Sequence, residues 1–171
     1  SILERALLDA ARAGKVVTVV VELMARFDEA ANITLADRLA EAGATVVYGV
    51  VGFKTHAKML MIVRREGENL RRYVHLSTGN YHVKTARLYT DIGLLTCAPA
   101  IGAAVHRIFL QLTGLGQEPK LQRLLQSPFT MHRELVRLIG HETEAARAGK
   151  PARILAKMNA LIKAQGAKKV D

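Results

Sequence analysis

The chain has no tryptophan, a single cysteine, and phenylalanine, tyrosine and tryptophan together make up only 5% of its 171 residues. The lone cysteine, Cys97, excludes a disulfide bond within the chain and favours a reducing, cytoplasmic setting. Half of all residues are nevertheless hydrophobic, which argues against disorder. The composition therefore predicts a folded protein whose core is built from aliphatic side chains.

Long apolar runs are also missing. The densest stretch, 16–23, is interrupted by Thr18 and Glu22, whereas a membrane-spanning helix needs about 20 mainly apolar residues. Nothing resembles a signal peptide, and the chain opens directly in a helical pattern without methionine. We interpret it as a segment of a longer cytoplasmic protein that has no transmembrane segment. Peripheral contact with a membrane stays open.

Acidic residues are the minority among charged ones. Twenty-five lysines and arginines face 15 acidic residues, which gives a formal net charge of +10. Such a balance favours a polyanionic partner, namely nucleic acid, anionic lipid or chains of phosphate. A basic protein without a polyanionic ligand is the alternative that charge alone leaves open.

Hydrophobic periodicity in the first half of the chain predicts an α/β fold. A helical pattern over 2–10 ends at Gly14, and two β-branched runs, 16–23 and 45–51, flank a helix that Asn32 is placed to cap. A strand–helix–strand unit implies a parallel pair of strands in a covered sheet.

The following segments predict more strands and then helices. Strands over 54–65 and 70–77, joined by a turn at 67–68, form a predicted hairpin, and 85–96 is a further predicted strand. From residue 101 the pattern is helical; Ser127-Pro128 opens a longer helix, and a short helix is expected over 154–161. We expect one domain over 1–171, with an α/β part at about 1–98 and a helical part at about 99–171.

The central motif is Lys-Thr-His-Ala-Lys-Met at 54–59. Alternate residues of a strand share a face, so Lys54, His56 and Lys58 are predicted to point the same way. A neutral imidazole nitrogen can attack phosphorus, and lysines beside it can stabilise phosphate oxygens. The alternative is a strand-end histidine flanked by solvated lysines, and the short motif by itself favours this reading.

Neighbouring segments add to the motif. A turn centred on 67–68 would set Lys58 opposite Ser77 and Leu60 opposite His75, so that His75 joins the same face. Arg26 lies just past the carboxyl end of the first strand, where α/β sheets bind ligands, and could grip phosphate there. A surface arginine paired with a nearby carboxylate is the competing reading.

Three motifs in order carry a family resemblance. They are Val-Glu-Leu-Met-Ala-Arg-Phe-Asp-Glu at 21–29, the motif at 54–59, and Tyr-Val-His-Leu-Ser-Thr-Gly-Asn-Tyr at 73–81, which continues in Lys-Thr-Ala-Arg-Leu-Tyr-Thr-Asp at 84–91. Over nearly its whole length the chain resembles the first phospholipase D-like domain of polyphosphate kinases. The resemblance implies a phospholipase D-like sandwich, in which helices flank a mixed β-sheet and a helical segment follows. It also implies reversible transfer of the terminal phosphate of ATP to inorganic polyphosphate, with Mg²⁺.

The resemblance assigns roles to individual residues. His56 matches the histidine that is phosphorylated, His75 a second important histidine, Tyr89 a tyrosine that contacts the nucleotide, and Arg26 a Mg²⁺–phosphate site that it would serve through phosphate oxygens. The predicted catalytic set is His56, His75 and Lys58, and the predicted phosphate and nucleotide set is Arg26, Lys54, Asn80 and Tyr89. The implied partners are ATP, polyphosphate, the other domains of the parent enzyme and further copies of it, with no specific nucleic acid.

One departure weighs on the alternatives. The wider superfamily pattern has an acidic residue five positions after Lys58, where Val63 stands here. This argues against a phosphodiesterase or nuclease that pairs two chains into a homodimer. A non-catalytic polyanion-binding module stays open. Because the family's remaining domains complete the site, the isolated segment is expected to be inactive.

Overall fold

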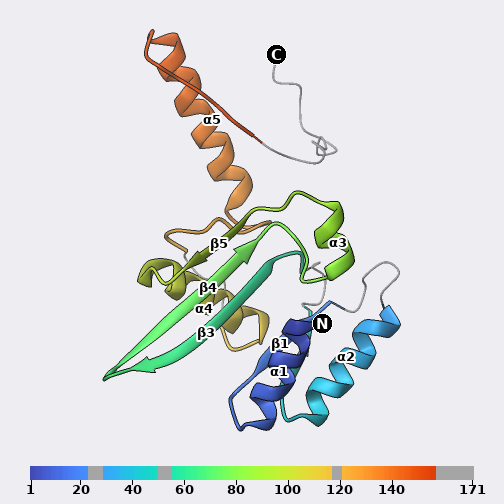
Figure 1. Cartoon of the computed structure of the whole chain (residues 1–171). Helices are drawn as coiled ribbons and strands as arrows, with labels where there is room; N and C mark the ends of the chain where they lie inside the picture. Colours follow the sequence, from blue (N-terminus) through green and yellow to red (C-terminus); the bar gives the residue numbers. More distant parts are fainter. Residues whose placement is uncertain (23–28, 50–54, 117–120, 157–171) are drawn as a thin grey trace. The chain divides into compact units, whose positions relative to one another are not determined.

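The computed structural model describes residues 1–22, 29–49, 55–116 and 121–156, and the chain divides into two compact units, Ser1–Leu124 and Leu125–Asp171. The elements of the first unit are α1 (Ile2–Arg12), β1 (Thr18–Val21), α2 (Glu29–Glu41), β2 (Thr45–Tyr48), β3 (Lys58–Glu66), β4 (Asn69–Ser77), α3 (Val83–Leu88), β5 (Gly93–Thr96) and α4 (Pro99–Leu112) (Figure 1). The second unit contains α5 (Met131–Arg147). The predicted mixed α/β class is confirmed. Within the described residues the strands form two sheets, β1-β2 and β3-β4-β5.

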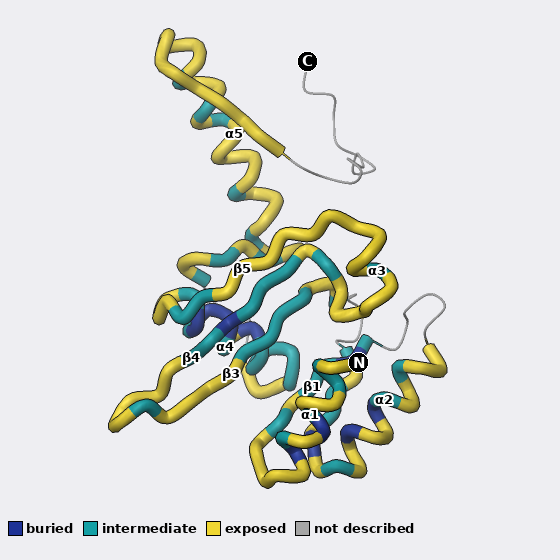
Figure 2. Tube along the Cα trace, viewed as in Figure 1, coloured by how far each residue is buried: buried dark blue, intermediate teal, exposed yellow. Residues whose placement is uncertain are grey.

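The first sheet is the predicted parallel pair. Val19 of β1 lies opposite Val46 of β2, and both side chains pack against a buried cluster contributed by α1, α2 and the turn before β2. This cluster consists of Leu8, Ala11, Leu39 and Ala44. Figure 2 shows the buried positions of α1 and α2 facing inward and the opposite sides of both helices exposed. Burial of these aliphatic side chains gives this half of the unit its own core.

The start of α2 corrects one prediction. The helix begins at Glu29, so Asn32 lies inside it and is not its N-cap. The Asn32 side-chain amide instead donates a hydrogen bond to the backbone carbonyl of Glu22, at 3.0 Å. Local sequence favoured capping because asparagine is a good N-cap residue. In the structure the amide therefore bonds a carbonyl ten positions earlier in the chain and does not cap the helix.

The second sheet confirms the predicted hairpin register. Lys58 lies opposite Ser77 and Leu60 opposite His75, and Gly67 takes a positive φ of 60° in the turn. Strand β5 pairs with the other side of β4, which makes β4 the central strand. Val74 of β4 is 2% exposed because α4, drawn in olive to yellow in Figure 1, packs against this strand.

The first residues of the predicted strand 54–65 lie outside the sheet. β3 begins at Lys58, residues 55–57 have no strand structure, and Lys54 lies outside the described residues. The shared strand face predicted for Lys54, His56 and Lys58 is therefore wrong for His56. The physical reason is pairing: β4 ends at Ser77, opposite Lys58, so no β4 residue continues the ladder beyond this point.

The predicted strand over 85–96 is also wrong in its first half. Residues 83–88 form helix α3, and only Gly93–Thr96 form a strand. The His82 side chain caps α3, because its Nδ1 accepts a hydrogen bond from the Thr85 backbone N–H at 3.4 Å. Histidine is not among the favoured capping residues, so the sequence carried no ordinary sign of this helix start.

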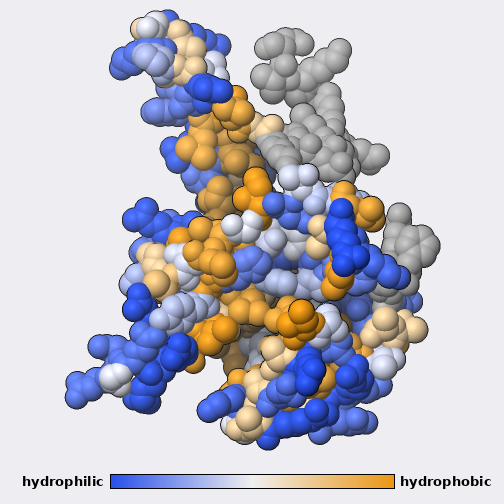
Figure 3. Space-filling model, in the orientation of Figure 1, coloured by the Kyte–Doolittle hydropathy of each residue, from blue (hydrophilic) through white to orange (hydrophobic). Residues whose placement is uncertain are grey.

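In the second unit α5 begins at Met131, after a turn in which Thr130 Oγ1 accepts a hydrogen bond from the Gln126 N–H at 3.0 Å. The predicted start at 127–128 is thus a few residues early. Residues 151–156 are not helical: the Arg153 N–H donates to the Glu142 carboxylate at 2.9 Å, which ties this segment back to α5. The rest of the predicted helix 154–161 lies outside the described residues. Apolar side chains along one side of α5 are about half exposed (Figure 3).

No helix in the described ranges is both long enough and apolar enough to cross a membrane.

Candidate active site

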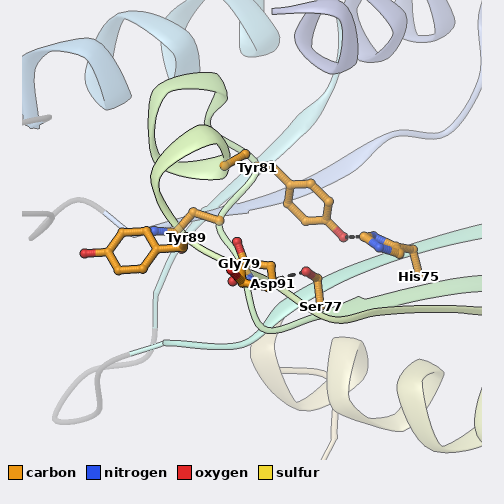
Figure 4. Close-up of a pocket in the computed structure, with 9 residues that line it drawn as sticks. His75, Ser77, Gly79, Tyr81, Tyr89 and Asp91 are labelled. Carbon is orange, nitrogen blue, oxygen red and sulfur yellow. Dashed lines mark hydrogen bonds between the residues drawn. The ribbon is translucent and has the colours of Figure 1, made fainter. Parts of the chain in front are cut away.

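An open pocket of about 480 Å³ lies where the end of β4, the loop after it and the segment around α3 meet (Figure 4). Three of the residues predicted from sequence, His75, Asn80 and Tyr89, line it together. The described residues that line it are His75, Ser77, Gly79, Asn80, Tyr81, Ala86, Tyr89, Thr90 and Asp91. Hydroxyl groups, an imidazole, an amide and a carboxylate thus surround a space open to solvent.

His75 reaches the pocket from the central strand. Its Nδ1 lies 2.8 Å from the Tyr81 hydroxyl, and the two ring centroids are 5.6 Å apart. Burial raises the pKa of Tyr81, so its phenol stays protonated at neutral pH. Gly93 lies on the far side of the ring, where a Cβ would approach His75 Nε2 to 2.9 Å. Figure 4 shows the Tyr81 and His75 side chains pointing toward each other, with Tyr89 projecting away from this pair.

The loop between β4 and α3 is locked to the segment before β5. The Thr78 N–H donates to the Ile92 carbonyl, and the Thr78 hydroxyl donates to Asp91 Oδ1 at 3.1 Å while accepting from the Ile92 N–H at 3.0 Å. The Gly79 N–H donates to Ser77 Oγ at 3.0 Å. A side chain at Gly79 would clash with the Asp91 carboxylate, so the carboxylate would have to leave its present position to make room for it.

His56 is exposed and lies on the segment that precedes β3. The Thr55 N–H donates to Glu22 Oε2 at 3.0 Å, and the Lys58 ammonium donates to the His56 carbonyl oxygen at 2.6 Å. The segment is therefore attached on one side to the end of β1 and on the other to the start of β3. Neither His56 nor Lys58 lines the pocket, but Lys58 lies opposite Ser77, which does.

Two predicted site residues, Arg26 and Lys54, lie outside the described residues. Among the described residues no group of three or more histidines, cysteines, aspartates and glutamates is arranged to hold a metal ion. Of the pocket-lining residues, Asp91 is the carboxylate, and one of its oxygens already accepts a hydrogen bond from Thr78. The described donor set is too small for a cage of protein ligands around Mg²⁺.

Sequence reasoning missed four residues of the site, namely Glu22, Tyr81, Asp91 and Gly93. Tyr81 and Asp91 stand inside the motifs at 73–81 and 84–91, but no spacing rule links a loop tyrosine to a strand histidine six positions earlier. The Glu22 carboxylate accepts a hydrogen bond from the N–H of a residue 33 positions away in the chain. Because 85–96 was predicted as one continuous strand, nothing indicated that Gly93 begins the strand β5.

The fold and the pocket define a mixed α/β domain with a histidine beside a polar, partly aromatic pocket. The chain belongs to the polyphosphate kinase family. Residues 1–118 match the family described as polyphosphate kinase C-terminal domain 1, and residues 124–170 match polyphosphate kinase C-terminal domain 2. The gap between the two matches falls at the boundary between the two compact units.

Individual relatives agree with this assignment. The chain is 66% identical over 160 residues to a polyphosphate kinase of Xylella fastidiosa strain 9a5c and 60% identical over 160 residues to one of Neisseria meningitidis serogroup C. These matches cover 94% of the chain and 23% of each relative. The crystal structure of polyphosphate kinase from Porphyromonas gingivalis superposes with a TM-score of 0.74 at 39% identity, covering 87% of the chain and 25% of that protein. The chain thus spans about a quarter of the length of these relatives.

Proposed function

We propose that the chain forms part of the active site of a polyphosphate kinase that moves the terminal phosphate of ATP reversibly onto inorganic polyphosphate through phosphorylated His56. The observation that carries this proposal is the family match over residues 1–118, which contains His56, His75 and the described residues of the pocket. The net charge of +10 supports a polyanionic substrate.

The proposed chemistry has two steps. A neutral imidazole nitrogen of His56 attacks the γ-phosphorus of ATP, a nitrogen–phosphorus bond forms, the bond to the bridging oxygen breaks, and ADP leaves with that oxygen. A terminal oxygen of polyphosphate then attacks the same phosphorus, and the nitrogen–phosphorus bond breaks to return free His56. The exposure of His56 supports this role, because both substrates must reach the ring.

The pocket supplies groups for binding. Tyr89 can contact the nucleotide, Asn80 can hydrogen-bond phosphate or ribose oxygens, and His75 can donate to a phosphate oxygen from the wall of the same pocket. Lys58 belongs to the proposed catalytic set, and Lys54 and Arg26 belong to the proposed phosphate-binding set, all three as cations. Mg²⁺ would be held mainly by the substrate's own phosphates, where it neutralises their charge, with Arg26 acting through the same phosphate oxygens.

Completion of the site would need more of the enzyme. Because the chain spans 23% of the length of its relatives, we expect the 171 residues alone to show little or no kinase activity. The remaining domains and a homo-oligomeric, cytoplasmic parent enzyme belong to the proposal.

Labelling with γ-labelled ATP tests the nucleophile in the complete enzyme. We expect an acid-labile label on His56, and His56→Ala should abolish both the label and polymer synthesis. His141→Ala is the matched control, because His141 is an exposed histidine of α5 in the other unit. Retention of label and synthesis in His56→Ala would refute the assignment.

Two further results would favour the alternatives. Cleavage of a phosphodiester by the 171-residue chain alone would indicate a nuclease or phosphodiesterase. Affinity for long polyphosphate without phosphoryl transfer in the complete protein would indicate a binding module. Whether the protein is a kinase or a binding module, its affinity for polyphosphate should fall steeply as the salt concentration rises, because binding releases cations from the polymer.

A further inference from the structure

We propose that Tyr81 is a positioning residue, which holds His75 in the tautomer that carries its proton on Nε2 and so makes this histidine a fixed hydrogen-bond donor in the pocket. The inference rests on the proposed function, because it concerns how His75 meets phosphate. It begins from one contact, the 2.8 Å separation between His75 Nδ1 and the Tyr81 hydroxyl.

The distance leaves the direction of this hydrogen bond to the tautomer of His75, and we take the phenol as the donor. Burial raises the pKa of Tyr81, so the phenol keeps its proton throughout the neutral range. A phenolic O–H that donates to Nδ1 requires this nitrogen to be unprotonated, and the proton of the neutral ring then lies on Nε2. The hydrogen bond at one ring nitrogen thereby decides what the other nitrogen can do.

The surroundings of His75 leave few other means of orienting the ring. Its cross-strand neighbours are Leu60 on β3 and Leu95 on β5, and neither side chain can form a hydrogen bond. Gly93 stands beside Nε2, where even a methyl group would come within 2.9 Å. Tyr81 therefore fixes the Nδ1 edge while the missing side chain at Gly93 leaves space at the Nε2 edge.

The arrangement suits a site where phosphate charge moves. A hydrogen-bond donor that is already oriented costs no reorganisation when a phosphate oxygen gains charge. If the ring takes up a second proton, Nδ1–H can donate to the phenolic oxygen, because a hydroxyl both donates and accepts. Tyr81 thus supports the same ring orientation in both protonation states without adding a charge to the pocket.

Tyr81→Phe tests the proposal with two readouts. Ring-nitrogen chemical shifts of the 171-residue chain should show His75 as the Nε2–H tautomer in the wild type, and the variant should show a mixture of tautomers. In the complete enzyme we expect kcat to fall about tenfold, the worth of one hydrogen bond, with KM for ATP nearly unchanged.

Tyr73→Phe is the matched control, since it removes a phenolic hydroxyl from β4 that is bonded to Glu66 and lies outside the pocket lining. It should leave the His75 shifts and kcat as they are. Gly93→Ala is a second variant, which crowds Nε2 without touching Tyr81 and should also change the His75 shifts and lower kcat.

Three results would overturn the inference: an Nδ1–H tautomer in the wild type, unchanged His75 shifts in Tyr81→Phe, or changed shifts with an unchanged kcat. Failure of the proposed function looks different. Persistent labelling in His56→Ala would refute the nucleophile, whereas the tautomer of His75 is read from its ring nitrogens without any activity.

Discussion

The two histidines of the site are held in different ways. His75 sits on the central strand β4, paired on one side with Leu60 of β3 and on the other with Leu95 of β5. His56 lies before the first residue of β3, on a segment that hydrogen bonds attach to Glu22 and Lys58. The backbone of His75 belongs to a continuous ladder, whereas His56 lies outside the strands of the described residues.

Loss of the hydrogen bond between Glu22 and the Thr55 N–H should have the largest effect on activity. Glu22→Ala removes the acceptor of the Thr55 N–H and frees the segment that carries His56. Since small misplacements of a reacting group cost on the order of a hundredfold in rate, we expect about this loss in the rate of His56 phosphorylation. The His75 ring-nitrogen shifts should stay unchanged, because the pocket lining does not include Glu22.

Glu41→Ala, at the exposed end of α2, is the control for this change and should leave the labelling rate unaltered. Equal labelling rates in Glu22→Ala and the wild type would show that the hydrogen bond between Glu22 and Thr55 does not position His56. The contrast between the two histidines would then be one of backbone geometry alone.

A smaller effect is expected on the side of the pocket. Gly79→Ala places a methyl group against the Asp91 carboxylate, and relief of this clash must disturb the Thr78–Asp91 hydrogen bond. Overpacking of this kind typically costs about 1–3 kcal/mol, so the free energy of unfolding of the first unit should fall by this order. Chemical denaturation followed by circular dichroism measures the change.

Gly140→Ala makes the same substitution in α5, where the added methyl group meets nothing within 4 Å. There it should stabilise the helix by about 0.5–1 kcal/mol, because alanine loses less backbone entropy than glycine. An unaffected Gly79→Ala would contradict the packing described for the pocket loop, and a destabilised Gly140→Ala would contradict the open space around Gly140.

The smallest effect concerns the far end of the hairpin, whose tip is hydrophilic (Figure 3). There Tyr73 donates to Glu66 at 2.6 Å and Arg71 to the same carboxylate at 3.4 Å, and the Tyr73 bond is the main reason that the pKa of Glu66 is lowered. A carboxyl group whose pKa is lower in the folded state stabilises the fold above the unfolded pKa, near 4.5. This contribution is lost as the pH falls below that value.

Urea denaturation between pH 7 and pH 3 checks this prediction. The stability difference between wild type and Glu66→Gln should shrink as the pH falls, while Glu68→Gln, at the exposed turn, should show no such trend. A difference independent of pH would mean that ionised Glu66 adds nothing at the tip. The His75–Tyr81 hydrogen bond should be unaffected by Glu66→Gln, since it lies at the other end of β4.

Much of the second sheet could be predicted because its determinants are local. A turn centred on 67–68 was enough to predict that Lys58 lies opposite Ser77 and Leu60 opposite His75. The parallel pairing of β1 and β2 likewise follows from two β-branched runs around one helix. In both cases the type and length of the connection between the strands indicate how they pair.

Prediction failed where a side chain takes a distant or unusual partner. Asn32 bonds the Glu22 carbonyl in place of capping α2, and His82 caps helix α3, most of which falls in the stretch 85–96 that was predicted as a strand. Family motifs named His56, His75 and Tyr89 as site residues, and their roles stay predictions. No motif gave a reason for Tyr81 or Gly93, whose importance depends on the orientation of a single ring.

By itself, the sequence determined the family through its motifs. It also determined the α/β class and the hairpin register, because periodicity and turn chemistry act over a few residues. Only the tertiary structure decided that His56 lies outside the sheet, that Glu22 holds its segment, and that Tyr81 and Gly93 enclose the ring of His75. These contacts join the ends of different elements. Their geometry follows from how strands and helices pack, which no local pattern of residues encodes.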